Sequence, residues 1–248
     1  MIAADNQLYS RQRELQLLYP NTIAVVGCGG IGSWVAILAA MSGVTHLYLY
    51  DPDILEESNR NRLPFCQGSI NRPKVEVVAE FIRSIRPDAT VYPMQSKVNK
   101  NALKSLIDMG VSPIIDCTDS PKTQLELYNY CKGIMSERAS KLYIRAGYDG
   151  TRIMVTSTVS GWIKADVEAE AYDTAPSWVV PAVTVAALAV AKMMMFFNQE
   201  VSLDISEIGI PILEKQKRIT ARCKQVKQVA AVDDSGFPDH AHTPEEEE

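Results

Sequence analysis

Short apolar runs alternate with longer segments of helical periodicity through the first 150 residues of this sequence. The β-branched, apolar runs at 23–26, 46–50 and 111–117 are typical of parallel strands covered on both faces. Residues 72–85 start with a proline near a helix start and carry an apolar stripe. Further helices are expected at 33–40, 101–109 and 122–134, and further strands at 90–94 and 141–146. This alternation predicts a Rossmann-like α/β fold with a doubly wound, mainly parallel sheet.

The pattern changes at both ends of this region. Residues 6–19 are expected to be helical, and 152–159 alternate like an antiparallel strand. Residues 161–176 are polar without a clear period, which favours a loop. We therefore expect four parts: an N-terminal helical arm (1–20), an α/β domain (21–157), the C-terminal part of the same domain (158–232) and a disordered tail (233–248).

The apolar segment 179–197 could indicate either a membrane span or a buried helix. Pro181 lies near its start and Lys192 interrupts it, so the uncharged run is too short to cross a bilayer. We expect a long buried helix and no membrane association.

The bulk composition is that of a globular protein, with 248 residues of which 46% are hydrophobic and 22% charged. The net charge of −5 argues against a general nucleic-acid-binding protein. The N-terminus lacks a basic segment followed by an apolar one, so we expect no signal peptide. Five widely spaced cysteines without a C-x-x-C pair argue against a disulfide framework or a cysteine-only zinc site. These features favour a cytoplasmic protein.

Four glycines, Gly27, Gly29, Gly30 and Gly32, separate the first strand from the first helix. Glycines let the backbone turn sharply and approach a ligand, and the following helix directs its free N–H groups at an anion. The spacing G-x-G-x-x-G matches a dinucleotide fingerprint, which does not distinguish NAD, FAD and ATP.

An acidic pair, Asp51 and Asp53, follows the second strand, and Asp51 lies 24 residues after Gly27. A carboxylate at this place can accept hydrogen bonds from a ribose. The alternative role for Asp51 is that of a cap for the next turn.

A polar, basic segment follows these acids. It contains Ser58, Asn59, Arg60 and Arg62, and Lys74 lies at the next helix start. NAD carries only a pyrophosphate, whereas a triphosphate needs the additional cations. This cluster favours ATP over NAD, although a solvated basic loop would have the same composition.

A second acidic group, Asp116 and Asp119, follows the fourth strand at the same predicted sheet edge, with Ser120 beside it. A carboxylate there can hold Mg²⁺ against phosphate oxygens. Asp119 is the better candidate because it lies nearer the loop, and Asp116 could equally be structural.

Taken together, these motifs resemble the ThiF/MoeB/HesA group, which includes the activating enzymes of ubiquitin-like proteins. The resemblance rests on six motifs in order: Tyr9-Ser-Arg-Gln, GCGGIGS at 27–33, DPD at 51–53, SNRNR at 58–62, RPK at 72–74 and DCTDS at 116–120.

The resemblance implies ATP-dependent adenylation of the C-terminal glycine of a ubiquitin-like β-grasp carrier protein, with release of pyrophosphate. It implies that Asp51 binds the ribose and that Asp119 binds Mg²⁺. Asn59, Arg62 and Lys74 would hold the phosphates. Arg11 would reach the γ-phosphate of a partner subunit, which requires a homodimer.

The sequence departs from this group at several positions. The usual SNLQR reads SNRNR, so Arg60 is an added charge and Asn61 replaces a glutamine. The usual TDN reads TDS, which introduces Ser120. The paired zinc cysteines of many relatives are missing, so we expect no zinc. No cysteine lies between 131 and 223, and Cys223 is a poor candidate for a reactive thiol, so we expect adenylation alone.

Three other functions remain open. A zinc-free branch of the same group dehydrates a carboxylate on a modified tRNA adenosine. The sequences GSW at 32–34 and DS at 119–120 resemble that branch. The overall acidity of the chain counts against binding of tRNA. A non-catalytic partner-binding relative usually loses the cations retained here. A nicotinamide dehydrogenase has no use for these cations.

Overall fold

A six-stranded sheet forms the centre of the computed structural model, which describes residues 7–65, 67–135, 143–148, 153–157 and 177–198. The strand order is β3-β2-β1-β4-β5-β6, and all neighbours are parallel except β5 and β6. The strands are β1 (Thr22–Val26), β2 (His46–Tyr50), β3 (Thr90–Met94), β4 (Ile114–Asp116), β5 (Tyr143–Tyr148) and β6 (Ile153–Thr156). This confirms the doubly wound, mainly parallel sheet with an antiparallel extension.

The order of the strands reverses at β1. The chain moves outward from β1 to β2 and β3, then crosses back so that β4 pairs with the other side of β1. In open α/β sheets a ligand binds outside the carboxyl ends of the strands at this reversal.

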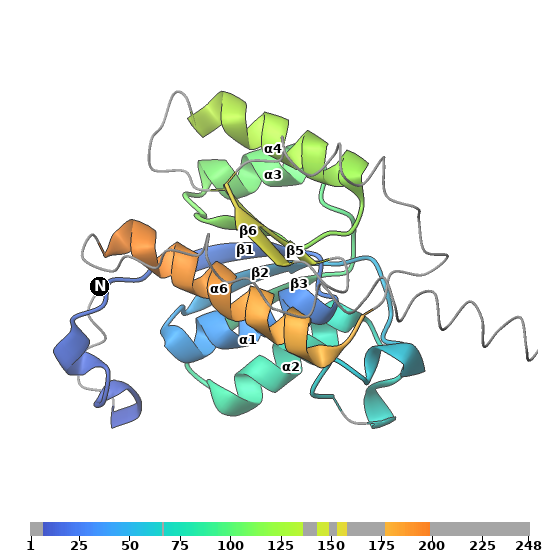
Figure 1. Ribbon diagram of the computed structural model, residues 1–248, viewed down its shortest axis with the longest axis horizontal. Coiled ribbons are helices and arrows are strands. Elements are labelled where there is room, and N and C mark those ends of the chain that lie inside the picture. Colours follow the sequence, from blue (N-terminus) through green and yellow to red (C-terminus); the bar gives the residue numbers. More distant parts are fainter. Residues whose placement is uncertain (1–6, 66, 136–142, 149–152, 158–176, 199–248) are drawn as a thin grey trace, which may run out of the picture. The chain divides into compact units, whose positions relative to one another are not determined.

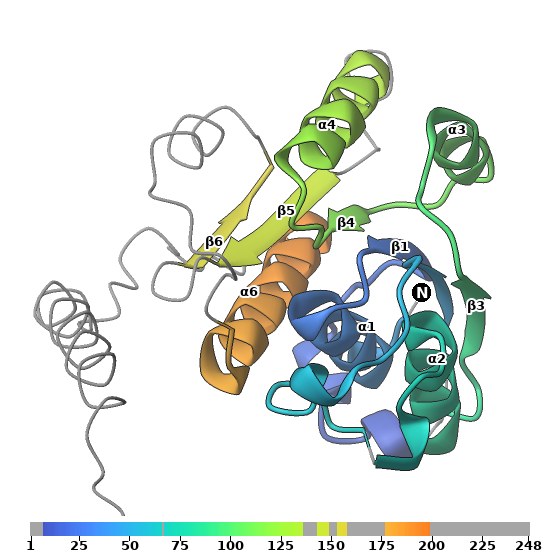
Figure 2. The same cartoon turned by 90° about the vertical axis from the view of Figure 1, so that its right-hand side faces the viewer.

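Helices cover both faces of the sheet (Figures 1 and 2). One face carries α1 (Gly30–Ser42), α2 (Lys74–Ile85) and α6 (Val179–Phe197), and the other carries α3 (Lys100–Asp108) and α4 (Pro121–Met135). The buried side chains form one hydrophobic cluster on each face of the sheet, and the larger cluster lies under α1, α2 and α6. There are two clusters because successive side chains of a strand point to opposite faces.

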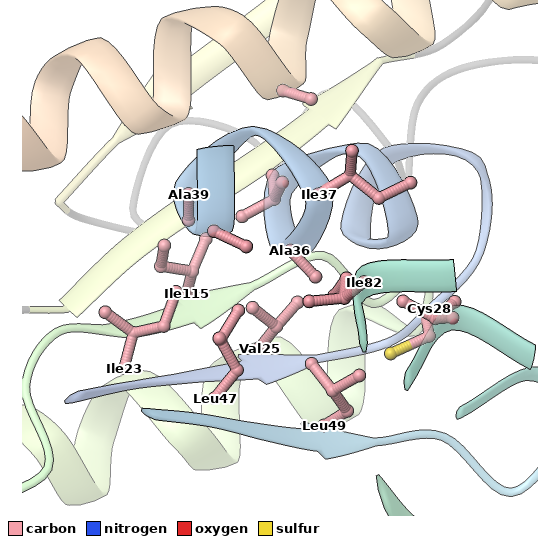
Figure 3. Close-up of a cluster of buried hydrophobic side chains, with 14 of the residues drawn as sticks. Ile23, Val25, Cys28, Ala36, Ile37, Ala39, Leu47, Leu49, Ile82 and Ile115 are labelled. Atoms are coloured by element: carbon pink, nitrogen blue, oxygen red, sulfur yellow. The ribbon is translucent and has the colours of Figure 1, made fainter. Parts of the chain in front are cut away.

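The central strand shows this alternation directly. Ile23 and Val25 lie in the core under α1 (Figure 3), while Ala24 and Val26 lie in the core under α3 and α4. All four are buried, so β1 requires an uninterrupted apolar run.

Helix α6 packs on α1 in the larger core. Its fully buried positions follow helical spacing along one side: Ala182, Val185, Ala186, Ala189 and Met193. Length and apolar composition alone would allow α6 to cross a membrane. The buried stripe instead makes α6 a core helix of this fold.

The N-terminal segment differs from the single helix expected at 6–19. It forms two 3-10 turns, Gln7–Tyr9 and Arg13–Leu15. The buried Tyr9 ring lies 4.9 Å from the Arg86 guanidinium, and Gln12 Nε2 donates to the Ser42 carbonyl at 3.2 Å. These contacts hold the segment against the fold and override its helical pattern.

Two further 3-10 turns, Glu57–Asn59 and Gln67–Ser69, lie between β2 and α2. The expected loop at 161–176 and the expected tail at 233–248 lie outside the described residues.

The position of α6 in the core makes its two sides respond differently to a charge. Val185→Asp should prevent folding or lower the free energy of unfolding by more than about 4 kcal/mol, because it buries an unpaired carboxylate. Ala187→Asp, on the exposed side of the same helix, should change it by less than about 1 kcal/mol. Urea denaturation followed by circular dichroism measures both. Equal tolerance of the two substitutions would contradict the core placement.

Candidate active site

The loop after β1 is tied to both neighbouring strands at the carboxyl edge of the sheet. The Gly27 N–H donates to the Tyr50 carbonyl at 2.7 Å, and the Cys117 N–H donates to the Val26 carbonyl at 2.8 Å. The segments after β1, β2 and β4 therefore meet at one edge, as the sequence predicts.

The glycines of this loop divide into packed and open positions. Gly27 has a φ of +87°, and a Cβ there would lie 3.0 Å from the Cys117 backbone. A Cβ on Gly32 would lie 1.7 Å from the Gly27 carbonyl oxygen. A Cβ on Gly29 would meet nothing within 4 Å. Open space therefore adjoins Gly29, directly before the N-terminus of α1, where a phosphate can approach the backbone N–H groups.

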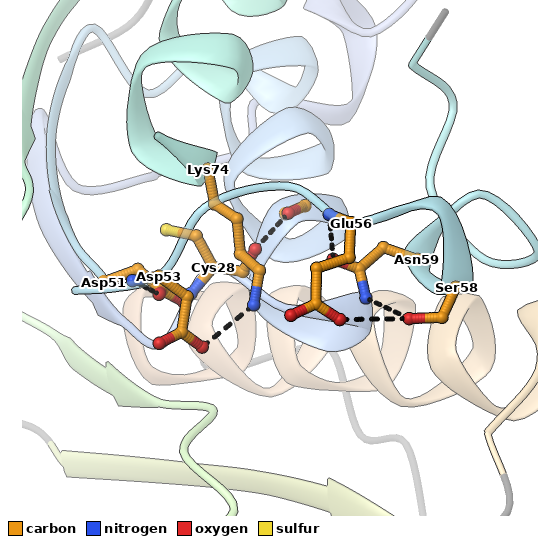
Figure 4. Close-up of polar contacts among 8 residues, drawn as sticks. Cys28, Asp51, Asp53, Glu56, Ser58, Asn59 and Lys74 are labelled. Carbon is orange, nitrogen blue, oxygen red and sulfur yellow. Dashed lines mark hydrogen bonds and ion pairs between the residues drawn. The ribbon is translucent and has the colours of Figure 1, made fainter. Parts of the chain in front are cut away.

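Asp51 pins this loop to β2 (Figure 4). It is 5% exposed, and its carboxylate accepts hydrogen bonds from the Cys28 N–H at 2.6 Å and the Asp53 N–H at 2.8 Å. Burial raises the pKa of Asp51, and the two backbone N–H groups act in the opposite direction. Each carboxylate oxygen has a second lone pair, so a ribose hydroxyl can still donate to Asp51.

Lys74 begins α2 and reaches back toward the same acids (Figure 4). Its Nζ lies 3.0 Å from Asp53 Oδ2, and its side chain is only 13% exposed. The ion pair holds the ammonium group at the sheet edge.

Asn59 has a local structural role. It is buried, its Oδ1 accepts a hydrogen bond from the Glu56 N–H at 3.1 Å, and its Nδ2 lies 3.5 Å from Ser58 Oγ (Figure 4). The Glu56 side chain completes this capping box. Asn59 thereby shapes the turn that carries Arg62.

Arg62 lies over the N-terminus of α1. A Cβ on Gly30 would lie 2.8 Å from Arg62 Cδ, and the Trp34 Nε1–H donates to the Arg62 carbonyl at 2.8 Å. The guanidinium Nη1 donates to the Ser58 carbonyl and to Asn61 Oδ1, both at 2.8 Å. The structure thus brings Arg62 to the glycine loop.

Asp116 and Asp119 have different environments. Asp116 is fully buried and accepts hydrogen bonds from Tyr143 OH at 2.6 Å, Thr118 Oγ1 at 2.7 Å and the Thr118 N–H at 3.0 Å. Asp119 is exposed. Ser120 Oγ accepts from the Thr123 N–H at 3.3 Å, at the start of α4. Asp116 is therefore a structural acid, and Asp119 is the carboxylate open to a cation.

No cluster of three or more metal-ligating side chains occurs among the described residues. Mg²⁺ does not require one, because it binds to one or two carboxylates with phosphates and waters. Asp119 at the sheet edge fits that mode of binding.

The cysteines near the site are packed thiols. Cys28 is fully buried, and burial raises the pKa of both Cys28 and Cys117 well above the usual value. Burial also raises the pKa of Cys131 to about 12. These three are therefore protonated at neutral pH and poorly nucleophilic. Cys66 and Cys223 lie outside the described residues.

Arg11 is the one predicted catalytic residue that the structure does not bring to this edge. It is exposed beside Gln12, which contacts Ser42 at the C-terminal end of α1. Helix α1 has 13 residues and is about 20 Å long, so Arg11 lies far from the glycine loop of its own chain.

Comparison with known proteins identifies the family. The ThiF family matches residues 7–200 of this sequence. The chain belongs to the ThiF family.

Curated relatives of several kinds share part of this sequence. The tRNA threonylcarbamoyladenosine dehydratase of Haemophilus influenzae is 37% identical over 44% of this chain and 42% of its own length. The SAMP-activating enzyme E1 of Haloferax volcanii is 31% identical over 46% of this chain and 43% of its own length. The molybdopterin-synthase adenylyltransferase of Salmonella typhimurium is 33% identical over 44% of each chain. Each of these three matches spans less than half the length of the relative.

Solved structures share the fold. The crystal structure of Escherichia coli tRNA N6-threonylcarbamoyladenosine dehydratase matches with a TM-score of 0.61 and 21% identity over 77% of this chain and 92% of that chain. The structure of E. coli MccB with MccA-N7isoASN matches with a TM-score of 0.60 and 20% identity, over 79% of this chain and 65% of that chain.

Several supporting residues of this ThiF-family site cannot be predicted from the sequence. Trp34 holds the backbone of Arg62, and Thr118 and Tyr143 bind the Asp116 carboxylate. Trp34 stands out in the sequence only as part of the GSW motif and Thr118 only as part of the DCTDS motif, and Tyr143 belongs to no motif. Their roles depend on contacts that the fold creates.

Two glycine substitutions distinguish the role of the loop in folding from its expected role in binding phosphate at Gly29. Gly32→Ala should lower the free energy of unfolding by about 3 kcal/mol or more, because its Cβ collides with a backbone oxygen. Gly29→Ala should leave the fold intact but weaken ATP binding at least about tenfold, because a methyl group enters the open space before α1. Thermal denaturation and isothermal titration with ATP measure these effects. Full ATP affinity in Gly29→Ala would exclude phosphate binding at this position.

Asp116 should make stability depend on pH. Burial raises its native pKa above the unfolded value of about 4, so the native state binds the proton more tightly. Relative to Asp116→Asn, the wild type should lose stability as pH rises from about 4 through the raised native pKa. The loss should be about 1.4 kcal/mol for each pH unit that separates the native pKa from the unfolded pKa. Urea unfolding of both proteins between about pH 4 and 8 measures the difference. Parallel curves would show that Asp116 does not titrate this way.

Proposed function

We propose that this protein is an ATP-dependent adenylyltransferase that activates a substrate carboxylate as an acyl-adenylate and releases pyrophosphate. The observation that carries the proposal is the arrangement around Gly29: open space at the start of α1, with Arg62 lying over the neighbouring Gly30. Lys74 and Asp119 lie at the same sheet edge. Relatives named as adenylyltransferases and activating enzymes support it.

The site residues can meet the needs of this reaction without a protein nucleophile. The carboxylate oxygen attacks the α-phosphorus while the bond from that phosphorus to the bridging oxygen breaks, and pyrophosphate leaves. Backbone N–H groups at the start of α1 stabilise charge on the α-phosphate. Arg62 and Lys74 neutralise the departing phosphates. Asp119 would hold Mg²⁺, which would supply further positive charge there. Asp51 orients the ribose.

The buried thiols support adenylation as the chemistry done at this edge. Cys28 and Cys117 adjoin the glycine loop but are held as neutral thiols because burial raises the pKa of each. Neither is suited to attack the adenylate, so the activated acyl group passes to an acceptor other than these two cysteines.

The preferred substrate is the C-terminal glycine of a ubiquitin-like carrier protein. Relatives named for SAMP, ThiS and molybdopterin synthase support a protein carboxylate, and the net charge of −5 is unfavourable for tRNA. The second candidate is the carboxylate of a modified tRNA adenosine. It is favoured by relatives named tRNA threonylcarbamoyladenosine dehydratase, which are 37%, 34% and 30% identical over their matched regions.

A homodimer would complete the site. Arg11 lies at the end of α1 opposite the glycine loop, so it can serve a triphosphate only when that triphosphate belongs to another chain. In this proposal a partner subunit supplies Arg11 to the γ-phosphate.

Pyrophosphate exchange into ATP tests the proposal. Exchange should require Mg²⁺ and a carrier ending in glycine, and Asp119→Ala and Arg62→Ala should each lower it at least about 100-fold by removing charge neutralisation at the phosphates. The matched control is Asp108→Ala, which removes an exposed carboxylate at the C-terminal end of α3, and it should retain full exchange.

Three outcomes decide between the candidates. Exchange that depends on threonylcarbamoyladenosine-containing tRNA and not on a carrier would favour the dehydratase function. Exchange unaffected by both site substitutions would place the reaction elsewhere. NADH binding without ATP binding would reject adenylation altogether.

A further inference from the structure

The side-chain amide of Asn61 joins two parts of the chain that are 116 residues apart. Its Oδ1 accepts a hydrogen bond from Arg62 Nη1 at 2.8 Å, and its Nδ2 donates to the Ser177 carbonyl at 2.8 Å. One amide therefore contacts both the guanidinium assigned to the phosphates and the residue two positions before α6.

Ser177 has a second contact on the sheet. Its Oγ hydrogen-bonds with the hydroxyl of Tyr148, the last residue of β5. The start of α6 is thus held from the phosphate side by Asn61 and from the sheet side by Tyr148.

Arg62 has two further contacts, with Ser58 and with Trp34. The Nη1 group that contacts Asn61 also donates to the Ser58 carbonyl, and the Arg62 carbonyl accepts from Trp34. Of the two groups that Nη1 contacts, Ser58 contributes a backbone carbonyl and Asn61 contributes a side-chain amide. A side chain can move with the guanidinium more easily than a backbone carbonyl can.

The chemistry of the bridge needs a side chain that both donates and accepts. An amide does so, whereas an aspartate would keep the acceptor but lose the donor to Ser177. A glutamine keeps both groups on a side chain one methylene longer. Asn61 therefore links the Arg62 guanidinium to the Ser177 backbone through a single amide.

We propose that Asn61 is a positioning residue that couples the phosphate-holding Arg62 to the start of α6, so that ATP binding orders the first turn of that helix. The proposal rests on the proposed function only in placing ATP phosphates on Arg62. A phosphate fixes the guanidinium by charge-assisted hydrogen bonds, and the amide then fixes Ser177. Three exposed apolar residues, Trp178 at the N-cap of α6 and Val179 and Val180 in its first turn, form a patch, so nucleotide binding sets the position of that patch.

Hydrogen–deuterium exchange of a peptide covering 177–185 tests the coupling in the full-length protein. In α6 the N–H groups of Val183, Thr184 and Val185 bond to carbonyls of the first turn, so the exchange of these three amides reports whether that turn is formed. MgATP should slow this exchange about fivefold in the wild type and leave it unchanged in Asn61→Ala. ATP affinity, measured by titration calorimetry, should fall by the same factor in Asn61→Ala, because the coupling is reciprocal.

Matched variants separate positioning from folding. Asn61→Gln should restore part of both effects, and Asn61→Asp should not restore the protection. Tyr148→Phe, which removes the contact on the sheet, should loosen the peptide with and without ATP. Asn101→Ala, on the exposed surface of α3, should behave as the wild type in both measurements.

The outcomes are separable. Equal protection by MgATP in the wild type and in Asn61→Ala overturns the coupling while leaving adenylation untouched. ATP-dependent protection that is lost in Asn61→Ala supports the coupling even if no carboxylate substrate gives pyrophosphate exchange. A wild-type protein that does not bind ATP overturns both proposals.

Discussion

The hydrogen bonds from two backbone N–H groups to the Asp51 carboxylate are the constraint on which the site depends. One comes from the glycine loop and the other from the segment after β2, so a single side chain fixes two segments relative to each other. The loop can close in this way because Gly32 lies against the Gly27 carbonyl, where any Cβ would collide. The start of α1 then faces open space at Gly29. Burying Asp51 raises its pKa, so ionising it is unfavourable in the absence of these two donors.

The core supplies the rigidity behind this loop. Small residues on α1 and α6, including Ala36, Ala39 and Ala189, are fully buried in the same hydrophobic cluster. Small side chains let helices approach closely, so α6 packs tightly along α1. The start of α6 lies near the turn that carries Arg62, where Asn61 contacts Ser177.

Polar residues at the sheet edge fall into a buried group and a group that reaches the surface, and residue type alone does not tell which group a residue belongs to. Asp116 and Asn59 are buried and maintain the loops: Asn59 is hydrogen-bonded within its own turn, and Asp116 is hydrogen-bonded to Thr118 and to Tyr143 of β5. Asp119 is exposed, and Lys74 extends to the edge through its ion pair with Asp53. In the proposed function the second group acts on the ligand, and the first group holds the loops that carry it. Arg62 connects them, because its guanidinium is held by the turn that Asn59 shapes.

The sequence by itself determined the order of strands and helices, the glycine loop and the identity of the acidic and basic residues at the edge. These are local features: β-branched runs predict buried strands, and glycine spacing predicts a tight turn. The sequence favoured Asp119 over Asp116 as the open carboxylate but left a structural role for Asp116 undecided. The tertiary structure decided it, because the burial of Asp116 and its hydrogen bond involve Tyr143, a residue of a neighbouring strand. Only the tertiary structure placed Arg11 at the far end of α1 and replaced the expected N-terminal helix by short turns, because Tyr9 packs on Arg86. Contacts between residues distant in sequence leave no periodic pattern, and for that reason the link from Asn61 to Ser177 could be found only in the folded chain.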